Sequence, residues 1–143
     1  MSQSREAKGE FTRYGFRDLL VGECLGIIQP DLCVSGGFSE FVKIHALAST
    51  FECRPFPTFG VSGIAVAAAL QAIATVPALP HAHVPVPLQN EPIIELDRKH
   101  NPLRDDLLHE PFVLNNGLLS VPQGPGLGVT VNEGVLKKYQ ANR

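Results

Sequence analysis

The feature that most constrains this chain is a short apolar run that ends in Pro-Asp and is followed by two glycines. The run Leu25-Gly26-Ile27-Ile28 directly precedes Gln29-Pro30-Asp31, and Gly36-Gly37 follow. Short apolar runs are typical of buried strands, and paired glycines allow a tight turn. Phe38–Ser49 then shows the apolar spacing of a helix, with Ser39 as its N-cap. The stretch therefore predicts one strand–loop–helix unit.

Asp31 is the first charged side chain after the predicted strand. In parallel α/β folds, ligands bind at the carboxyl ends of the strands, so Asp31 is a candidate functional carboxylate. Pro-Asp is also ordinary turn chemistry, and a strand-end aspartate with a purely structural role is the alternative. The spacing alone leaves both interpretations open.

The segments that follow continue the alternation of strands and helices and then become irregular. We expect short helices over 17–23, 64–74 and 133–140, and further strands over 51–54 and 93–97. The second strand should end at Pro55-Phe56-Pro57, because proline cannot donate to a sheet ladder.

Four further segments are predicted as connections. The proline-rich segment 76–89 indicates a loop, and residues 101–106 a turn that leads into an extended region. Asn116-Gly117 between apolar residues predicts a hairpin, and Gly124–Gly128 is typical of a Gly-Pro loop.

The composition excludes several classes of protein. The 143 residues suffice for one domain with a core, and the net charge of −2 argues against a nucleic-acid partner. The sequence has no apolar run of about 18 residues, so no membrane span is expected. Met1–Lys8 lacks the apolar core of a signal peptide. The odd set Cys24, Cys33 and Cys53 is typical of buried free thiols in a reducing compartment, so we expect a cytoplasmic protein.

Several motifs, taken together in their order and spacing, are similar to a known family. They are Gln29-Pro30-Asp31, Gly36-Gly37-Phe38-Ser39-Glu40-Phe41, Gly63-Ile64-Ala65, Glu91-Pro92-Ile93-Ile94-Glu95-Leu96-Asp97, Asn101-Pro102-Leu103-Arg104 and Gly124-Pro125-Gly126-Leu127-Gly128. From about Gly9 onward the chain resembles the C-terminal part of mandelate racemase-like members of the enolase superfamily. Within that group it is most similar to galactarolactone cycloisomerases and sugar-acid dehydratases.

The resemblance implies a (β/α)8 barrel with a separate capping domain. It also implies Mg²⁺ and a proton abstraction next to the carboxylate of a sugar acid or lactone. Such a barrel needs about 250 residues. We therefore predict an α/β fold that is the C-terminal part of a (β/α)8 TIM-type barrel, a partial barrel with an irregular strand and hairpin tail. Residues 1–8 would be a polar leader, 9–110 the partial barrel, and 111–143 the hairpin and tail.

The resemblance also implies roles for four residues. Glu10 would be a Mg²⁺ ligand, with a solvated leader residue as the alternative. Asp31 would match the aspartate that pairs with a catalytic histidine, but Thr58 stands at the histidine position and is left as a substrate-binding residue. Glu95 would hydrogen-bond the substrate carboxylate or enolate, and the alternative is a rim residue paired with an arginine. The lysine and the two other metal ligands of the family are not found in this chain.

Two hypotheses of different class follow. The chain belongs to a sugar-acid cycloisomerase or dehydratase lineage, or it is a non-catalytic barrel remnant that self-associates or pairs with another chain. A partial barrel exposes sheet edges, which predicts a homo-oligomer. His81 and His83 have the spacing of a metal pair, but the surrounding prolines favour an exposed loop.

Overall fold

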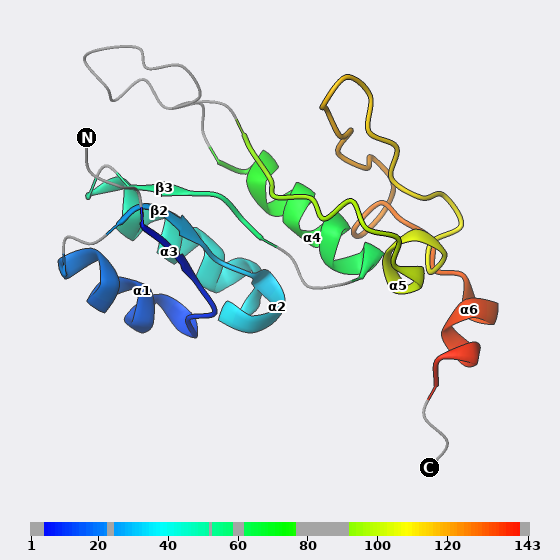
Figure 1. Cartoon of the computed structure of the whole chain (residues 1–143), viewed down its shortest axis with the longest axis horizontal. Helices are drawn as coiled ribbons and strands as arrows, with labels where there is room; N and C mark the ends of the chain where they lie inside the picture. The colour runs from blue at the N-terminus through cyan, green and yellow to red at the C-terminus, as the bar shows by residue number, and fades with distance from the viewer. Residues whose placement is uncertain (1–4, 23–24, 52, 59–61, 77–91, 141–143) are drawn as a thin grey trace.

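A three-stranded parallel sheet lies at the centre of the N-terminal half of the protein. The computed structural model describes residues 5–22, 25–51, 53–58, 62–76 and 92–140 (Figure 1). The strands are β1 (Arg5–Lys8), β2 (Leu25–Gln29) and β3 (Arg54–Pro55), in the order β1-β2-β3. The bounds of β2 confirm the strand that the apolar run predicts.

Two helices cover one face of this sheet. They are α1 (Thr12–Val21) and α3 (Gly37–Ser49), which lie together below the strands in Figure 1. The buried side chains between them and the sheet form one core cluster. Its members are Phe16, Leu20, Ile28, Ile44, Ala48 and Cys53. The predicted helix at 17–23 thus begins five residues earlier than expected, because Phe16 and Leu20 form its buried stripe.

The turn between β2 and α3 contains an extra short helix, α2 (Leu32–Ser35). Gly36 and Gly37 have φ angles of 111° and 77°, a left-handed conformation that glycine adopts readily. Gly36 is the N-cap of α3, so the prediction of Ser39 as N-cap was wrong. The sharp left-handed turn starts the helix two residues before Ser39.

The second predicted strand, β3, lies later than predicted and ends at the first of the two prolines. Phe56 N donates to the carbonyl of Ile28 at 2.9 Å, and Thr58 N donates to that of Pro30 at 3.2 Å. Alternate residues of a parallel strand turn their N–H groups toward the same neighbour. The missing donors of Pro55 and Pro57 therefore fall on the outer side of β3, and pairing with β2 continues past them. The strand itself ends at Pro55, as the prolines predict, although single backbone hydrogen bonds to β2 and Pro30 continue at Phe56 and Thr58.

The helix α4 (Gly63–Ala74) confirms the predicted alanine-rich helix, and Ser62 caps it by accepting from Ala65 N at 3.2 Å. A buried cluster of Leu32, Phe41 and Ala72 joins α2 and α3 to α4. Gly63 lies so close to the carbonyl of Arg104 and the side chain of Leu108 that a Cβ there would clash. This close approach brings the C-terminal half against α4.

The C-terminal half is mostly irregular, as expected, but its details differ. Residues 93–97 form no strand, contrary to the prediction. The predicted turn at 101–106 contains α5 (Pro102–Asp105), with Asn101 as N-cap. The predicted hairpin is reduced to one bridge between Asn115 and Leu118.

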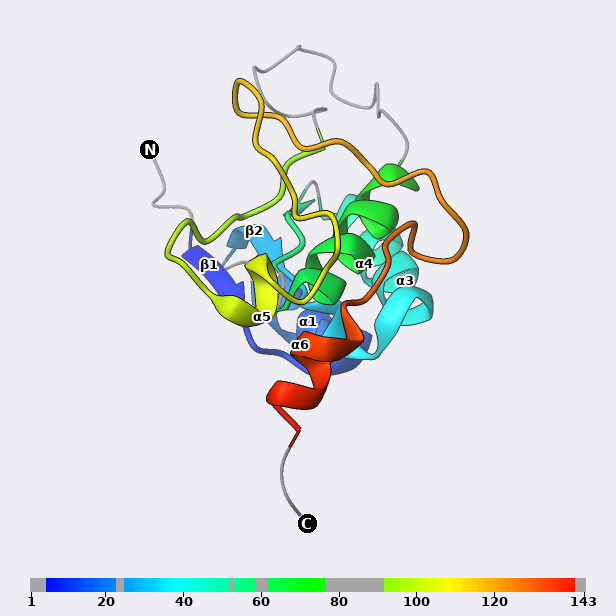
Figure 2. The same ribbon diagram turned by 90° about the vertical axis from the view of Figure 1, so that its right-hand side faces the viewer.

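The chain ends in a short helix that the sequence predicts, α6 (Glu133–Lys138). Figure 2 shows the C-terminal half passing alongside α4. One anchor is Gln71, whose Nε2 donates to the carbonyl of Pro122 at 2.7 Å.

No helix within the described ranges is long and apolar enough to cross a membrane. Of the loop predicted over 76–89, residues 77–89, with His81 and His83, lie outside the described residues, as does Cys24.

Candidate functional site

Asp31 lies where β2 ends, and its side chain caps the next helix. Oδ1 accepts from Cys33 N at 2.8 Å, and the carbonyl of Asp31 accepts from Ser35 Oγ at 2.7 Å. The carboxylate is half-buried. The structural role that the Pro-Asp pattern allows is therefore realised, and it holds the carboxylate in one orientation at the carboxyl end of the sheet.

Thr58 is the register partner of Asp31. The two residues form an isolated parallel bridge just beyond the ends of β2 and β3. The structure thus brings together the two positions at which the resembling family would hold an aspartate and a histidine. A threonine hydroxyl at this place can hydrogen-bond a ligand but does not act as a base at neutral pH.

Glu95 reaches the same end of the sheet from an irregular segment. Gln29, the last residue of β2, donates from Nε2 to Glu95 Oε2 at 2.9 Å. This bond of Glu95 is to an amide, and both predicted roles of Glu95, as a substrate contact or as a rim residue paired with an arginine, stay predictions. The contact joins Gln29, two residues before Asp31, to one of the predicted site residues.

Gln29 is a residue that sequence reasoning missed. It is 5% exposed, and its Oε1 is buried with no hydrogen-bond partner among the described residues. A buried polar atom without a partner costs about 1–3 kcal/mol. The signal that points to it is a single amide at the end of an otherwise apolar strand.

Glu10 does not join this group in any contact of the described residues. It is half-buried just before α1, with its carboxylate against Gly15, where a Cβ would clash with it. The described part of the chain contains no group of three His, Cys, Asp or Glu side chains placed to hold a metal. These residues therefore do not fit the Mg²⁺ site that the resemblance implies.

The two described cysteines differ in exposure. Cys53 is buried in the core, as predicted, whereas Cys33 is exposed and contradicts the prediction of a buried thiol. Cys33 follows the cap residue Asp31 on the first turn of a surface helix. Partial burial, the nearby Asp31 charge and a hydrogen bond to Asp31 together raise the pKa of the Cys33 thiol. A raised pKa makes this thiol a poor nucleophile.

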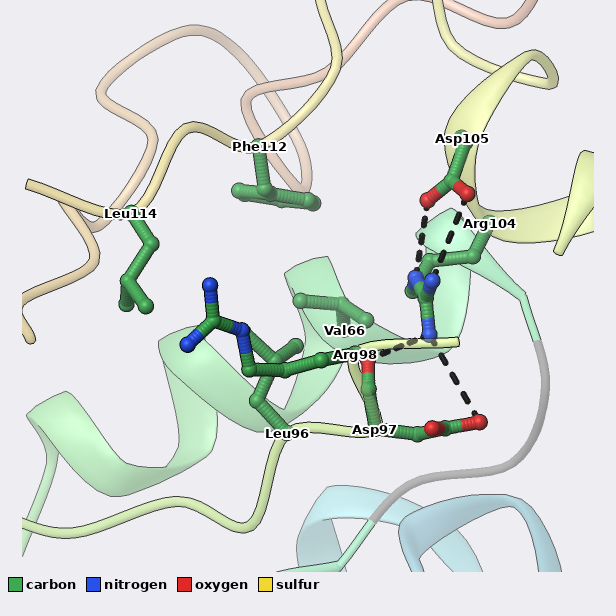
Figure 3. Close-up of a pocket in the computed structure, with 8 residues that line it drawn as sticks. All are labelled: Val66, Leu96, Asp97, Arg98, Arg104, Asp105, Phe112 and Leu114. Carbon is green, nitrogen blue, oxygen red and sulfur yellow. Dashed lines mark hydrogen bonds and ion pairs between the residues drawn. The ribbon is translucent and has the colours of Figure 1, made fainter. Parts of the chain in front are cut away.

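A cavity of about 130 Å³ lies between α4 and the C-terminal half (Figure 3). Its lining includes Leu96, Asp97, Arg98, Arg104 and Phe112.

The Arg104 guanidinium is already used by the protein. Its Nε donates to Asp105 Oδ1 at 2.8 Å, Nη1 to the carbonyl of Asp97 at 2.5 Å, and Nη2 to the carbonyl of Lys99. Figure 3 shows the bonds of Arg104 to Asp105 and Asp97 on one side of the cavity. The cluster joins α5 to residues 97–99 through the Arg104 guanidinium.

Comparisons with known proteins agree on one family. The family model described as Enolase C-terminal domain-like matches residues 8–135. The chain is 41% identical over 128 residues to a D-galactarolactone cycloisomerase from Agrobacterium fabrum, covering 90% of this chain and 33% of that protein. It is 32% identical over 130 residues to an arabinonate dehydratase from Saccharolobus solfataricus, covering 91% and 31%.

The fold comparison gives the same family. The crystal structure of the 3,6-anhydro-D-galactonate cycloisomerase from Zobellia galactanivorans superimposes with a TM-score of 0.77 and 36% identity. That match covers 93% of this chain and 34% of that one. The chain therefore spans about a third of the length of the relatives it matches.

Proposed function

We propose, since the chain belongs to the enolase C-terminal domain-like family, that it forms one wall of a barrel site for a sugar acid or its lactone. The observation that supports this proposal most directly is the grouping at the carboxyl ends of β2 and β3. There Asp31 is the register partner of Thr58, and Gln29 holds Glu95. Strand ends of this kind are where parallel α/β folds bind ligands.

The chemistry of the lineage is removal of the proton next to a carboxylate. A positioned general base is needed for that step, and Thr58 stands where the base is expected. The described residues of this chain can therefore bind and orient a polyhydroxy acid but do not supply the base. The described residues also do not assemble a Mg²⁺ site.

A second function, association without catalysis, is favoured by the open sheet. The described sheet has three strands, whereas a closed barrel has eight. Both β1 and β3 therefore have one strand neighbour within the described ranges, and strand edges of this kind pair with other chains. In this second proposal the protein acts through a homo-oligomer or by pairing with another chain.

Thermal denaturation with a panel of ligands tests the first proposal. D-Galactonate, D-arabinonate, D-gluconate and D-galactarolactone should raise Tm, because a ligand that binds only the folded state stabilises it. Aliphatic acids of the same length, without hydroxyl groups, are the control and should leave Tm unchanged. If the sugar acids and the aliphatic acids change Tm equally, only the second function, association, remains.

A further inference from the structure

We propose that Asn116 is a site of spontaneous deamidation, at which the chain reacts with itself and with water, and that the isoaspartate product opens the hairpin. Asn116 and Gly117 form an exposed Asn-Gly pair between apolar residues. The predicted hairpin is present here as the single bridge between Asn115 and Leu118. Neither the family resemblance nor the proposed function uses this turn.

The turn leaves the reacting groups open to solvent. Asn116 and Gly117 have φ angles of 49° and 82°, positive at both central positions as a type I′ turn requires. Two backbone bonds close the turn, from Asn115 N to the Leu118 carbonyl at 3.0 Å and from Leu118 N to the Asn115 carbonyl at 2.9 Å. Neither bond uses the Gly117 nitrogen. Gly117 has no side chain to shield this nitrogen, and a Cβ there would meet no atom of the described residues within 4 Å.

The reaction is an internal substitution at the side-chain carbonyl of Asn116. After hydroxide removes the Gly117 N–H proton, the nitrogen bonds to Asn116 Cγ. The Cγ–Nδ2 bond breaks, and the amide group takes a proton from water and leaves as ammonia. Water then opens the five-membered imide at either of its two carbonyl carbons. Addition at Cγ yields aspartate, whereas addition at the backbone carbon yields isoaspartate, whose main chain runs through Cγ.

The folded hairpin opposes ring closure only weakly. Closure needs the peptide group between Asn116 and Gly117 to turn out of the type I′ conformation, so the turn must open locally. One bridge holds the turn, and the apolar side chains beside it are exposed, Val113 at 66% and Leu118 at 73%. A two-stranded hairpin is marginally stable by itself, and segments with few buried contacts open at low free energy.

The other described asparagines each lack one of these features. Asn101 precedes Pro102, whose nitrogen has no proton to lose. Asn132 is held by its capping bonds at the start of α6. Asn115 is followed by Asn116, whose side chain shields the attacking nitrogen. Among these asparagines, Asn116 is therefore the expected position of the reaction.

The two products affect the turn differently. Aspartate keeps the original backbone and adopts a positive φ about as readily as asparagine does. Isoaspartate inserts an extra carbon into the main chain of a two-residue loop, and the length of the loop sets the register of the hairpin. The bridge between Asn115 and Leu118 is therefore lost in the isoaspartate form and kept in the aspartate form. Both products make the net charge one unit more negative than −2.

The test compares the native full chain with the same chain in guanidinium chloride. Both are incubated at neutral and at mildly alkaline pH, and peptide mapping by mass spectrometry follows Asn101, Asn116 and Asn132. We expect Asn116 to react first and faster at alkaline pH, with a native rate no more than about tenfold below the denatured rate, which corresponds to an opening free energy of about 1.4 kcal/mol. A larger reduction in the native chain, or earlier reaction at Asn101 or Asn132, overturns the proposal.

Two variants locate the reaction. Asn116→Gln would have to close a six-membered ring, so it should yield no deamidated product at this turn during the same incubation. Asn115→Gln is the matched control and should react at Asn116 as the unaltered chain does. Deamidation of this turn that persists in Asn116→Gln, or that stops in Asn115→Gln, contradicts the assignment to Asn116.

The effect on the hairpin has its own readout. The isoaspartate form is separated by ion exchange, and the backbone amide signal of Leu118 is followed by NMR. This signal should move to its random-coil position in the isoaspartate form, whereas Asn116→Asp should keep the position of the unaltered chain. An unmoved Leu118 signal in the isoaspartate form overturns the opening of the hairpin.

Discussion

Asp31 and Thr58 are register partners across the carboxyl ends of two parallel strands, held by the bond from Thr58 N to the carbonyl of Pro30 at 3.2 Å. The backbone holds Thr58 opposite Asp31, but the Thr58 side chain carries no basic group.

The purified chain should not exchange the α-proton of sugar acids with solvent. Loss of a positioned general base costs about 10²–10⁴ in rate. Thr58→His alone should not restore exchange, since the described residues also lack a metal cage. Proton–deuterium exchange followed by NMR on a panel of sugar acids with Mg²⁺ is the measurement. Exchange that disappears in Asp31→Asn would show that a working site exists and that other residues build it.

Magnesium should bind weakly or not at all. A Mg²⁺ ion takes near-octahedral oxygen coordination. Glu10 is the candidate ligand that the resemblance supplies, and it lies against Gly15 before α1. Titration calorimetry should give no stoichiometric site tighter than about millimolar. Glu10→Gln should behave like the unaltered chain, and a tighter site that this substitution removes would contradict the prediction.

The chain should form a dimer or a larger assembly. Phe56 and Thr58 direct their N–H groups to β2, which leaves Pro55 and Pro57 on the outer side of β3. The edge of β1 is therefore the better surface for pairing. Analytical ultracentrifugation at micromolar concentration is the measurement, and a clean monomer would refute it.

A helix surface is the competing interface. Phe38 and Val42 are exposed on α3, at 43% and 56%. The double variant Phe38→Lys with Val42→Lys should associate normally if the sheet edge is responsible. Dissociation of this variant would assign the interface to α3.

Stability should fall in acid through Glu40. Its carboxylate accepts from the backbone N–H of Arg13 at 3.0 Å and from Lys43 Nζ at 3.2 Å. The first of these bonds, with smaller help from Lys43 and the Arg13 charge, holds the pKa of Glu40 below its usual 4.5. A depressed folded-state pKa contributes stability above the unfolded pKa, and this is lost as pH falls through the folded value.

The measurement is the midpoint of urea denaturation at a series of pH values. Glu40→Gln should flatten the decline below pH 4.5, and Glu110→Gln, at an exposed carboxylate, should not. His45 adds a separate loss of stability that begins as the pH falls below 6.5, because burial lowers the pKa of its imidazole. An unchanged acid limb in Glu40→Gln would contradict the assignment.

Arg104 should be the most sensitive cation of the C-terminal half. Its side chain is 10% exposed and bonds Asp105 as well as the carbonyls of Asp97 and Lys99. Arg104→Ala should lower the free energy of unfolding by about 2–4 kcal/mol, because several charge-assisted bonds are lost together. The exposed neighbour Arg98→Ala is the control and should change it by less than about 0.5 kcal/mol. Equal effects of the two substitutions in chemical denaturation would refute the role of Arg104.

The sequence predicts the regular half of this fold well. Periodic apolar spacing predicts α4, Gly63–Ala74, within one residue, and the run of Leu25–Gln29 is a strand throughout, whereas α1 begins five residues before its predicted start. Motif order also identifies the family.

The misses have tertiary causes. The segment 93–97 has the alternation of a strand but forms none, since pairing depends on a neighbour that local pattern does not encode. The prolines at 55 and 57 predict the end of β3, but only the sheet geometry reveals that their missing N–H groups lie on its outer side. Gln29 was missed because its contact with Glu95, 66 residues away in the sequence, forms only in the folded chain.

The prolines of β3 also determine how far any assembly can grow. At 55 and 57 the outer edge offers carbonyl oxygens but no N–H groups, so an added strand would form only half of its ladder there. Growth by strand addition is thus one-sided. One-sided growth closes after a single symmetric pairing, whereas fibres need two complementary edges on every copy. Pro55 and Pro57 therefore favour a closed pair of copies over an extended fibre.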